Sequence, residues 1–394
     1  MLGNSKRYLV PSLVFIILFF FLFRRRLWAQ NRIKPTTAFI EVDNHYPTHP
    51  THQCKAIYGE KDSNHHVIRE QSECNSYINH TSRMEKIRVV SVHCGNPDLV
   101  ILQKKSLDAF MMEAYEYIVY DDSMAIPDVS NYYTSNMTEK MTAAILSVGG
   151  EYRRIPPQIH LDRRCLFPHT IEPFTQNANV RVSNIFQFMF RDAVNFCSES
   201  KIMFMEADVL LTKPLNVSDF LLTSNVSAAG VSQGRGFKSK GFSFSITYIW
   251  NPILIFDLLN IPGSLDLNFD CGRVYVRNAE FSVNVFDYLD TSGHLYEWLH
   301  KHNPHVKYLS LGSLWTNTDA PFVKTVSLWN QKLSNSSLNV KRVEILGDYF
   351  LHFRNGGNWM SEGPEVKNQI KVMVEILLDH IDRVRTFYLS NPIK

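Results

Sequence analysis

The sequence lacks a strong excess of charge of either sign, an internal repeat and a long low-complexity tract. Its 394 residues include 41 lysines and arginines and 38 aspartates and glutamates, so the formal net charge is +3 at pH 7. This near balance gives no indication of a nucleic-acid partner. The chain does have apolar residues, 45% of the total, over a length sufficient for one large domain or two ordinary ones. A substantial buried core can therefore form.

Cysteine is scarce as well. The six cysteines are Cys54, Cys74, Cys94, Cys165, Cys197 and Cys271. An even number permits disulfide bonds in an oxidising compartment but does not demonstrate them. Five Asn-x-Ser/Thr sequons lie in the same part of the chain, at Asn79, Asn136, Asn216, Asn225 and Asn335. Together these features favour a lumenal environment for most of the chain.

The N-terminus holds an apolar run, Tyr8 to Phe23, that is short for a membrane span and is flanked by Lys6-Arg7 and by Arg24-Arg25-Arg26. Two apolar residues beyond the arginines could lengthen it if the arginines snorkel. A cleaved signal peptide is the alternative, but three arginines before Ala29 disfavour cleavage there. The positive-inside rule alone would place the C-terminal side in the cytosol. We nevertheless expect an uncleaved signal anchor with a lumenal C-terminal side, because the sequons and cysteines favour that orientation.

These features predict four segments. Residues 1–7 form a short cytoplasmic tail, residues 8–28 a transmembrane anchor, residues 29–85 a lumenal stem and residues 86–394 the folded domain. The stem is rich in His, Asn, Pro, Thr and Ser and lacks sustained periodicity. A Cys54–Cys74 bridge could pin it.

Beyond the stem, strand and helix patterns alternate. They predict strands at residues 87–93, 117–120 and 152–155, with helices at residues 99–112 and 138–148 between them. Such alternation is typical of a parallel, doubly wound sheet. We therefore predict an α/β, Rossmann-like fold with a mostly parallel sheet and flanking helices.

Later patterns predict further elements. They are a helix at 179–196, strands at 202–205, 227–232 and 242–250, a Gly-rich basic loop at 233–241, a short helix at 252–259, a helix from about 278 to 288, a strand at 343–353 and a terminal helix at 364–388. The terminal helix is amphipathic, which indicates a packing element.

An acid-x-acid triplet, Glu206-Ala207-Asp208, directly follows the short apolar strand. Acids at positions i and i+2 at a strand end project the same way. Two such carboxylates repel each other unless a positive charge lies between them. The natural candidate is a hard divalent cation that shares its remaining ligand positions with phosphate. The triplet alone is equally compatible with the start of a surface loop.

The helix before this strand carries Arg181 and Arg191 on one stripe. Two arginines beside a strand that delivers acids could hold phosphate bidentately. The alternative is that both are surface residues whose stems cover the helix. Of the two, Arg181 is the better candidate for a functional role.

Three features together resemble the Golgi-type glycosyltransferases of the GT-A fold, over roughly residues 86–359. The first is the Rossmann-like alternation with a strand end at Asp121-Asp122, and the second is the helix–strand–acid unit at 181–208, which matches the family's DxD element. The third is the segment His352-Phe-Arg-Asn-Gly-Gly-Asn-Trp359. It is similar to the His-Phe-x-Gly-x-x-Lys-Pro-Trp ending of glycogenin-like members, with the Lys and Pro absent and the spacing one residue shorter.

The resemblance implies a metal site and a donor site. Asp208 would be a direct ligand of Mn²⁺ or Mg²⁺, and His352 would be a third protein ligand. Glu206 stands where the family has Asp and would contact the metal or the ribose.

The remaining implied contacts concern the nucleotide-sugar donor. Gly356, Gly357 and Trp359 would lie along the diphosphate, and Asp122 would lie near the base or ribose. Arg181 is the candidate for a phosphate contact on the helix.

The function that the resemblance implies is that of a lumenal, metal-dependent glycosyltransferase. It would move a sugar from a nucleotide-sugar donor, UDP-linked by expectation, to a glycan, glycoprotein or glycolipid acceptor. Its place would be the Golgi or endoplasmic reticulum membrane, as a single-pass type II protein. Inverting enzymes need a carboxylate as proton acceptor, for which Asp270 and Glu280 are candidates. Glu280 could equally be a helix N-terminal acid and Asp270 a turn residue, and retaining chemistry needs no such base.

Two alternatives stay open. A non-catalytic, lectin-like or scaffolding type II membrane protein could keep the fold, and the departure at Glu206 motivates this reading. A metal-dependent phosphohydrolase or nuclease would be expected to show more acids and histidines near Asp208 than the sequence has.

Overall fold

The computed structural model describes residues 86–123, 136–167, 178–194, 200–239, 242–271, 273–276, 285–288, 290–302, 305–315, 343–354 and 364–390. The chain divides into two compact units, residues 1–41 with 274–287 and residues 42–273 with 288–394. In the first unit, the described residues belong to a two-stranded sheet of β8 (Arg273–Val276) and β9 (Val285–Tyr288). The elements below belong to the second unit.

One half of the large sheet is parallel. Its strands are β1 (Ile87–His93), β2 (Tyr115–Asp121), β3 (Glu151–Arg154) and β4 (Lys201–Glu206). The connecting helices are α4 (Pro97–Phe110) and α5 (Met137–Ser147). Asn96 caps α4 by accepting a hydrogen bond from the Asp98 backbone N–H, and Pro97 occupies the first turn, where its missing N–H is harmless. Helical crossovers of this kind let successive strands run parallel.

The other half of the large sheet contains its antiparallel strand. The seven strands follow the order β10-β6-β7-β4-β1-β2-β3. β6 (Ala228–Ser239) and β7 (Phe242–Asp257) form a long antiparallel pair, and β10 (Tyr308–Leu311) runs parallel to β6. The far end of β7 pairs with β4, so β4 lies at the centre of the sheet.

A smaller antiparallel sheet begins where β4 ends. Its strands, in order, are β11 (Ser313–Trp315), β12 (Val343–Leu346), β13 (Phe350–Phe353) and β5 (Val209–Leu211). Two residues, Ala207 and Asp208, separate β4 from β5. The chain therefore passes from one sheet to the other within the acid-x-acid triplet.

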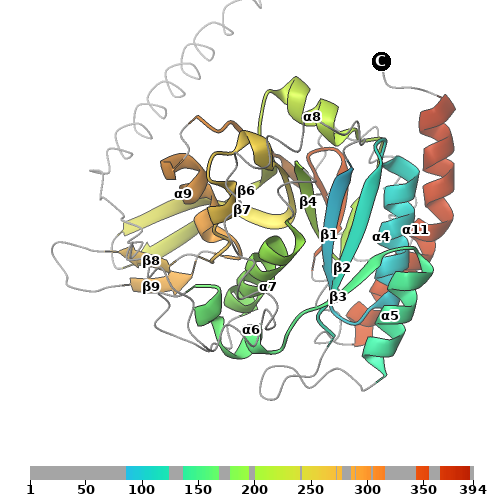
Figure 1. Ribbon diagram of the computed structural model, residues 1–394, viewed down its shortest axis with the longest axis horizontal. Helices are drawn as coiled ribbons and strands as arrows, with labels where there is room; N and C mark the ends of the chain where they lie inside the picture. Colours follow the sequence, from blue (N-terminus) through green and yellow to red (C-terminus); the bar gives the residue numbers. More distant parts are fainter. Residues whose placement is uncertain are drawn as a thin grey trace, which may run out of the picture. The chain divides into compact units, whose positions relative to one another are not determined.

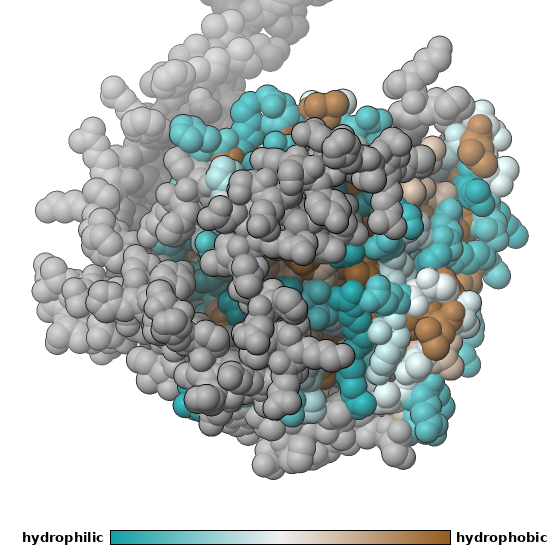
Figure 2. Space-filling view, viewed as in Figure 1, coloured by the Kyte–Doolittle hydropathy of each residue, from teal (hydrophilic) through white to brown (hydrophobic). Residues whose placement is uncertain are grey.

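Helices cover both faces of the large sheet (Figure 1). The remaining helices are α6 (Gln158–Leu161), α7 (Ala178–Ala193), α8 (Val217–Ser224), α9 (Gly293–His302) and α11 (Pro364–Ser390). Val89 packs into the core with α4, α5 and α11, whereas Val90 packs into the core with α6, α7 and α9. This alternation is the two-residue period of a strand buried on both faces. On the outside, the described surface in Figure 2 is largely hydrophilic with small separate apolar patches.

The predicted fold class, an α/β fold with a mostly parallel sheet and flanking helices, is confirmed. The predicted strands and helices between residues 87 and 155 match the observed elements to within about two residues. The terminal helix and the helix before β4 are also observed.

Two predictions between residues 233 and 259 were wrong, whereas the strand predicted at 242–250 is part of β7. The expected Gly-rich loop is the outer part of β6, and the expected helix at 252–259 is the end of β7, followed by a short 3₁₀ turn. Aromatic and β-branched residues of β7, such as Ile246 and Tyr248, pair with the Gly-rich stretch and supply the strand preference that it lacks. Pro252 lies at a register shift between β6 and β7, where its missing N–H is tolerated.

Two further predictions were wrong. The expected single strand at 343–353 is a hairpin, because Gly347 (φ 56°) and Asp348 (φ 65°) turn the chain between β12 and β13. Residues 285–288, expected to end a helix, form strand β9.

The predicted tail, anchor and stem, with the Cys54–Cys74 pair, lie outside the described residues. Among the helices that the structure does describe, none combines the length and the apolar character that a membrane crossing requires.

Candidate metal centre

The acid-x-acid triplet is placed by the central strand β4. Met203 and Phe204 in β4 are completely buried, and the strand is flanked by β1 and β7. Glu206 is the last residue of β4, and Asp208 lies in the turn that leads to β5. The buried strand thus fixes the point at which the two carboxylates emerge.

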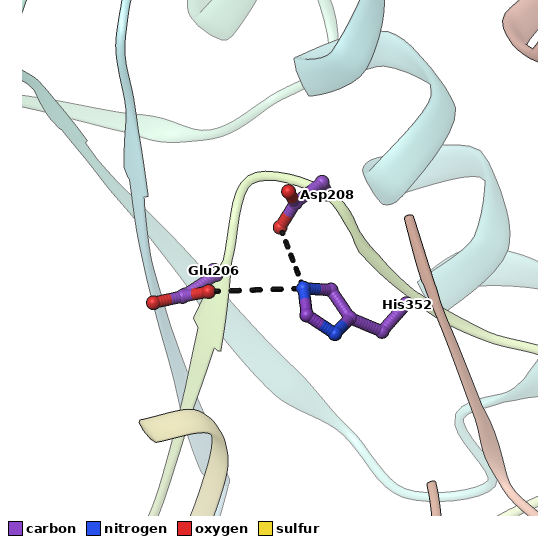
Figure 3. Close-up of side chains that lie close together, drawn as sticks. All are labelled: Glu206, Asp208 and His352. Carbon is purple, nitrogen blue, oxygen red and sulfur yellow. Dashed lines mark ion pairs between the residues drawn. The ribbon is translucent and has the colours of Figure 1, made fainter. Parts of the chain in front are cut away.

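His352 reaches the same place through the smaller sheet. β13 pairs with β5 so that His352 lies opposite Val209, and the Phe353 backbone N–H donates to the Asp208 carbonyl over 3.0 Å. His352 Nε2 lies 3.6 Å from Asp208 Oδ1 and 3.9 Å from Glu206 Oε2. Figure 3 shows the imidazole directed at both carboxylates. The three residues that the sequence singled out as ligands are therefore neighbours in space.

The charges in this cluster shift the protonation of its members. Burial, together with the negative charge of Asp208, raises the pKa of Glu206 to about 8. Burial by itself would lower the pKa of His352, but the Asp208, Glu344 and Glu206 carboxylates outweigh it and raise that pKa. A cation bound beside Glu206 and Asp208 would favour the deprotonated form of Glu206.

The donor set fits a divalent metal ion. The three side chains offer two carboxylate oxygens and one imidazole nitrogen, and these atoms lie within 4.8 Å of one another. Asp208 and His352 are buried, whereas Glu206 is partly exposed. Oxygen and imidazole ligands suit Mn²⁺, Mg²⁺ and neighbouring divalent ions. Glu206, Asp208 and His352 would hold such an ion.

Glu344 fixes the orientation of His352. It lies opposite His352 on the neighbouring strand β12, is completely buried, and accepts a hydrogen bond from His352 Nδ1 over 2.7 Å. Ser313 Oγ donates to its other oxygen over 2.6 Å, and Arg354 Nε lies 3.2 Å from the first. Burial alone would raise the pKa of Glu344, but its contacts with His352, Ser313 and Arg354 lower it. A charged carboxylate on Nδ1 leaves Nε2 as the ligand atom, the arrangement common for metal-binding histidines.

An aromatic ring completes the surroundings of the imidazole. The Trp250 ring packs edge-on to His352 with 5.1 Å between ring centroids. The Arg354 guanidinium lies 4.9 Å from the Trp250 ring centroid, a cation–π contact. The imidazole is therefore held both by its hydrogen bond and by packing.

Glu206 is held from β7. Asn251 is completely buried and donates from Nδ2 to Glu206 Oε1 over 2.8 Å. Asn251 lies beside Trp250 at the register shift between β6 and β7, so the irregular strand aims an amide at the acid. Asp290, which accepts a hydrogen bond from Tyr248 over 3.0 Å, adds to the negative charge that raises the pKa of Glu206.

Two of the other described candidates, Asp122 and Asp270, are bonded to partners of their own. Asp122, just beyond β2, forms a 2.7 Å hydrogen bond with Nε2 of the buried His160. Asp270 pairs with the buried Arg163, and although burial would raise the pKa of Asp270, Arg163 and His294 lower it. Arg181 lies in the first turn of α7 and forms no ion pair with another described residue.

Four predicted site residues lie outside the described residues: Glu280, Gly356, Gly357 and Trp359. Sequence reasoning had missed Glu344, Asn251 and Trp250, which hold the metal-binding side chains. One signal was available for Glu344, a single acid inside the otherwise apolar strand Val343–Leu346.

The fold and the site together define a class of protein: a mixed α/β protein with a divalent-metal ligand set where its central strand ends. No family model matches the chain, and a comparison with curated protein sequences finds no significant match. Solved structures similar to it include the following three proteins.

The first is core-mannan synthase A (CmsA/Ktr4) from Aspergillus fumigatus in a Mn/GDP form, with 11% identity, 47% of this chain and 62% of that chain covered, and a TM-score of 0.28. The galactosyltransferase LgtC with donor and acceptor sugar analogues has 16% identity, coverage of 43% and 58%, and a TM-score of 0.27. The mannosyltransferase Ktr4p from S. cerevisiae has 11% identity, coverage of 58% and 70%, and a TM-score of 0.29. The matched part spans less than two thirds of the first two proteins. Scores this low identify no family, so function is argued from the site.

Proposed function

We propose that the chain is a metal-dependent glycosyltransferase that uses a nucleotide-sugar donor. The observation that carries this proposal is the cluster of Glu206, Asp208 and His352 at the end of the central strand of a mostly parallel sheet. In open α/β sheets, ligands bind at the carboxyl ends of the strands. A carboxylate–imidazole set there suits a cation that is shared with a diphosphate.

The chemistry fits these side chains. Breaking the bond between the anomeric carbon and the diphosphate leaves negative charge on the leaving group, and a bound divalent ion would stabilise that charge. The protein's own residues set the geometry: Asn251 orients Glu206, and Glu344 orients His352. Because Glu344 and Trp250 fix the imidazole beforehand, little reorganisation is needed when the donor arrives.

Besides the metal ligands, further residues would contact the nucleotide-sugar donor. Gly356, Gly357 and Trp359 line the diphosphate, and Asp122 and Arg181 contact the nucleotide. In an inverting reaction the proton acceptor is Asp270 or Glu280. Despite its burial, Asp270 has a lowered pKa because of its ion pair with Arg163, which makes its carboxylate a weaker proton acceptor.

The proposed setting is the lumen of the Golgi or endoplasmic reticulum, with a single N-terminal anchor and a glycan, glycoprotein or glycolipid acceptor. The apolar run at residues 8–23, within the segment 8–28, supports the anchor. Asn136 and Asn225, two of the five sequon asparagines, are exposed, as an oligosaccharide would require.

The test is a donor screen with the full-length protein, purified in detergent from a secretory host. Nucleotide release would be measured for a panel of nucleotide sugars with Mn²⁺, and again with EDTA. We expect metal-dependent release from one donor, lost in Asp208→Asn and kept in Asp382→Asn, a matched change of an exposed acid on α11.

Silence with every donor, from a folded protein that also binds no nucleotide, would contradict the proposal and favour a non-catalytic relative. Metal-dependent hydrolysis of phosphate esters without sugar transfer would favour a phosphohydrolase.

A further inference from the structure

A buried glutamine lies beneath the acid-x-acid turn. Gln103, on α4, is completely buried. Its Nε2 donates to two backbone carbonyls, those of Glu206 and Val209, each over 2.8 Å. These carbonyls bracket Asp208, so a single side-chain amide ties down both ends of the turn.

The orientation of this amide is fixed from its other side. Gln103 Oε1 accepts a hydrogen bond from the Tyr117 hydroxyl over 2.8 Å and lies 3.1 Å from His93 Nε2. A glutamine amide has two N–H donors and an oxygen with two lone pairs, and here all four positions are engaged. A flipped amide would turn its oxygen toward two carbonyls and its NH₂ group toward the Tyr117 hydroxyl and His93. The observed orientation is therefore the one that the network permits.

The turn needs such a restraint because of what it carries. Glu206 and Asp208 project toward one imidazole, and their mutual repulsion favours a turn that lets them move apart. Gln103 restrains the backbone without contributing any charge. A lysine or arginine in its place would neutralise the acids and compete with a cation for them.

We propose that Gln103 is the positioning residue of the metal centre, holding the Glu206–Val209 turn in the conformation that binds a divalent cation. This inference rests on the metal centre of the proposed function and is independent of the sugar chemistry. It predicts that loss of the amide weakens metal binding even though Gln103 lies outside the ligand set.

The chain offers a matched control. Ser106 lies one turn later on α4, is also completely buried, and donates from Oγ to the Leu211 carbonyl over 2.7 Å. It therefore joins the same helix to the same strand, β5, two residues beyond the bracketed turn. Loss of either hydrogen-bonding group leaves buried carbonyls unpaired and lowers stability. Only the loss of Gln103 removes the hydrogen bonds that restrain the turn carrying Glu206 and Asp208.

The experiment measures Mn²⁺ affinity of the full-length protein from the free-ion signal in electron paramagnetic resonance, with thermal unfolding recorded in parallel. We expect Gln103→Met, which keeps the length of the side chain, to raise the Kd for Mn²⁺ about tenfold or more, on the scale of second-sphere changes at metal sites. Ser106→Ala is expected to lower the unfolding temperature but to change Kd less than about twofold.

Tyr117→Phe is a second variant that tests the proposal if Gln103→Met fails to fold. It removes one of the two donors that fix the amide and leaves the contacts to the turn in place. We expect it to raise Kd by about threefold, a smaller effect than that of Gln103→Met.

Three results would overturn the proposal: a Gln103→Met protein with unchanged Kd, a Ser106→Ala protein that loses as much affinity, or a failure of Gln103→Met to fold together with an unchanged Kd in Tyr117→Phe. A wild-type protein that binds no Mn²⁺ would overturn it as well, along with the metal centre. A wild-type protein that binds Mn²⁺ but transfers no sugar would contradict the proposed function alone, and the change in Kd would still decide the role of Gln103.

Discussion

Two buried histidines next to the acid-x-acid turn differ in their protonation. Burial lowers the pKa of His93 to about 4, and the hydrogen bond with Gln103 only partly opposes this. The pKa of His352 is raised, although His352 is buried as well. The difference lies in the neighbours, since His93 faces an amide and a phenol whereas His352 faces three carboxylates. Burial alone therefore does not decide what a histidine does here.

The two histidines belong to two hydrogen-bond networks that support the same site, one uncharged and one charged. On the side of His93, a neutral network acts through Gln103 on backbone carbonyls of the turn. On the side of His352, a charged network acts through Glu344 directly on a ligand side chain. The uncharged hydrogen bonds of Gln103 leave the carboxylates of Glu206 and Asp208 free to attract a cation. The buried carboxylate of Glu344 makes Nε2 of His352 a stronger metal ligand.

The largest expected effect removes a ligand from either side of the site. Mn²⁺ at about a hundred times its Kd should stabilise the wild-type protein by ~2.7 kcal/mol. Asp208→Asn and His352→Gln should each abolish this gain, because both residues contribute a ligand atom. This gain is measured by thermal unfolding with and without Mn²⁺, and each variant is compared with its own metal-free form. A His352→Gln protein that kept the full gain would remove the histidine from the site.

The next effect concerns the charged network alone. Glu344→Gln preserves the shape of the side chain and its bond with His352 but removes the negative charge. Mn²⁺ affinity should fall about 10- to 100-fold, as is typical for such partners of metal-bound histidines. Isothermal titration calorimetry measures this loss. Ser313→Ala, which removes one donor to Glu344, should have a much smaller effect, and equal losses in both variants would argue for a general loss of structure.

The smallest effect concerns the neutral network. His93 has a pKa near 4 in the folded protein and about 6.5 when unfolded, so below pH 6.5 the unfolded state binds the extra proton. Its contribution to stability is complete above that pH and is lost as the pH falls. Between pH 6.5 and 5.5 the free energy of unfolding should drop by about 1 kcal/mol from this group. Denaturant unfolding at both pH values would show a shallower drop in His93→Gln, and identical slopes would contradict the neutral assignment.

Much of the site followed from short stretches of sequence. A buried strand that ends in two acids is a local pattern, and it indicated Glu206 and Asp208. His352 was named because the segment that begins with it resembles the ending of glycogenin-like glycosyltransferases. Gln103 and Asn251 were not predicted because their roles depend on partners far away in the chain. Glu344 is near His352 in sequence, but their contact depends on the hairpin of β12 and β13, which the sequence had indicated as a single strand. In the sequence, Gln103 is one polar residue within a helix pattern, and such a residue does not reveal what it binds.

The fold shows the same limit. Helices and strands up to residue 155 were predicted from periodicity, since each element carries its own pattern. At residues 252–257 an apolar run with an initial proline indicated a helix, yet pairing with β4 and β6 makes it a strand. Such pairing depends on segments distant in sequence, so local preference was overridden.

The pairing of β5 with β13 also sets the order in which the site can be assembled during synthesis. More than a third of the chain separates Asp208 from His352. Domains emerge from the ribosome N-terminal end first, so the two acids are exposed well before the imidazole that completes their ligand set. α4, which carries Gln103, is covered still later, when α11 arrives and the Leu378 carbonyl accepts a hydrogen bond from Lys105 over 2.9 Å. A nascent or truncated chain therefore holds two acids without a complete ligand set, and binding of a metal ion by all three residues would wait until translation is almost finished.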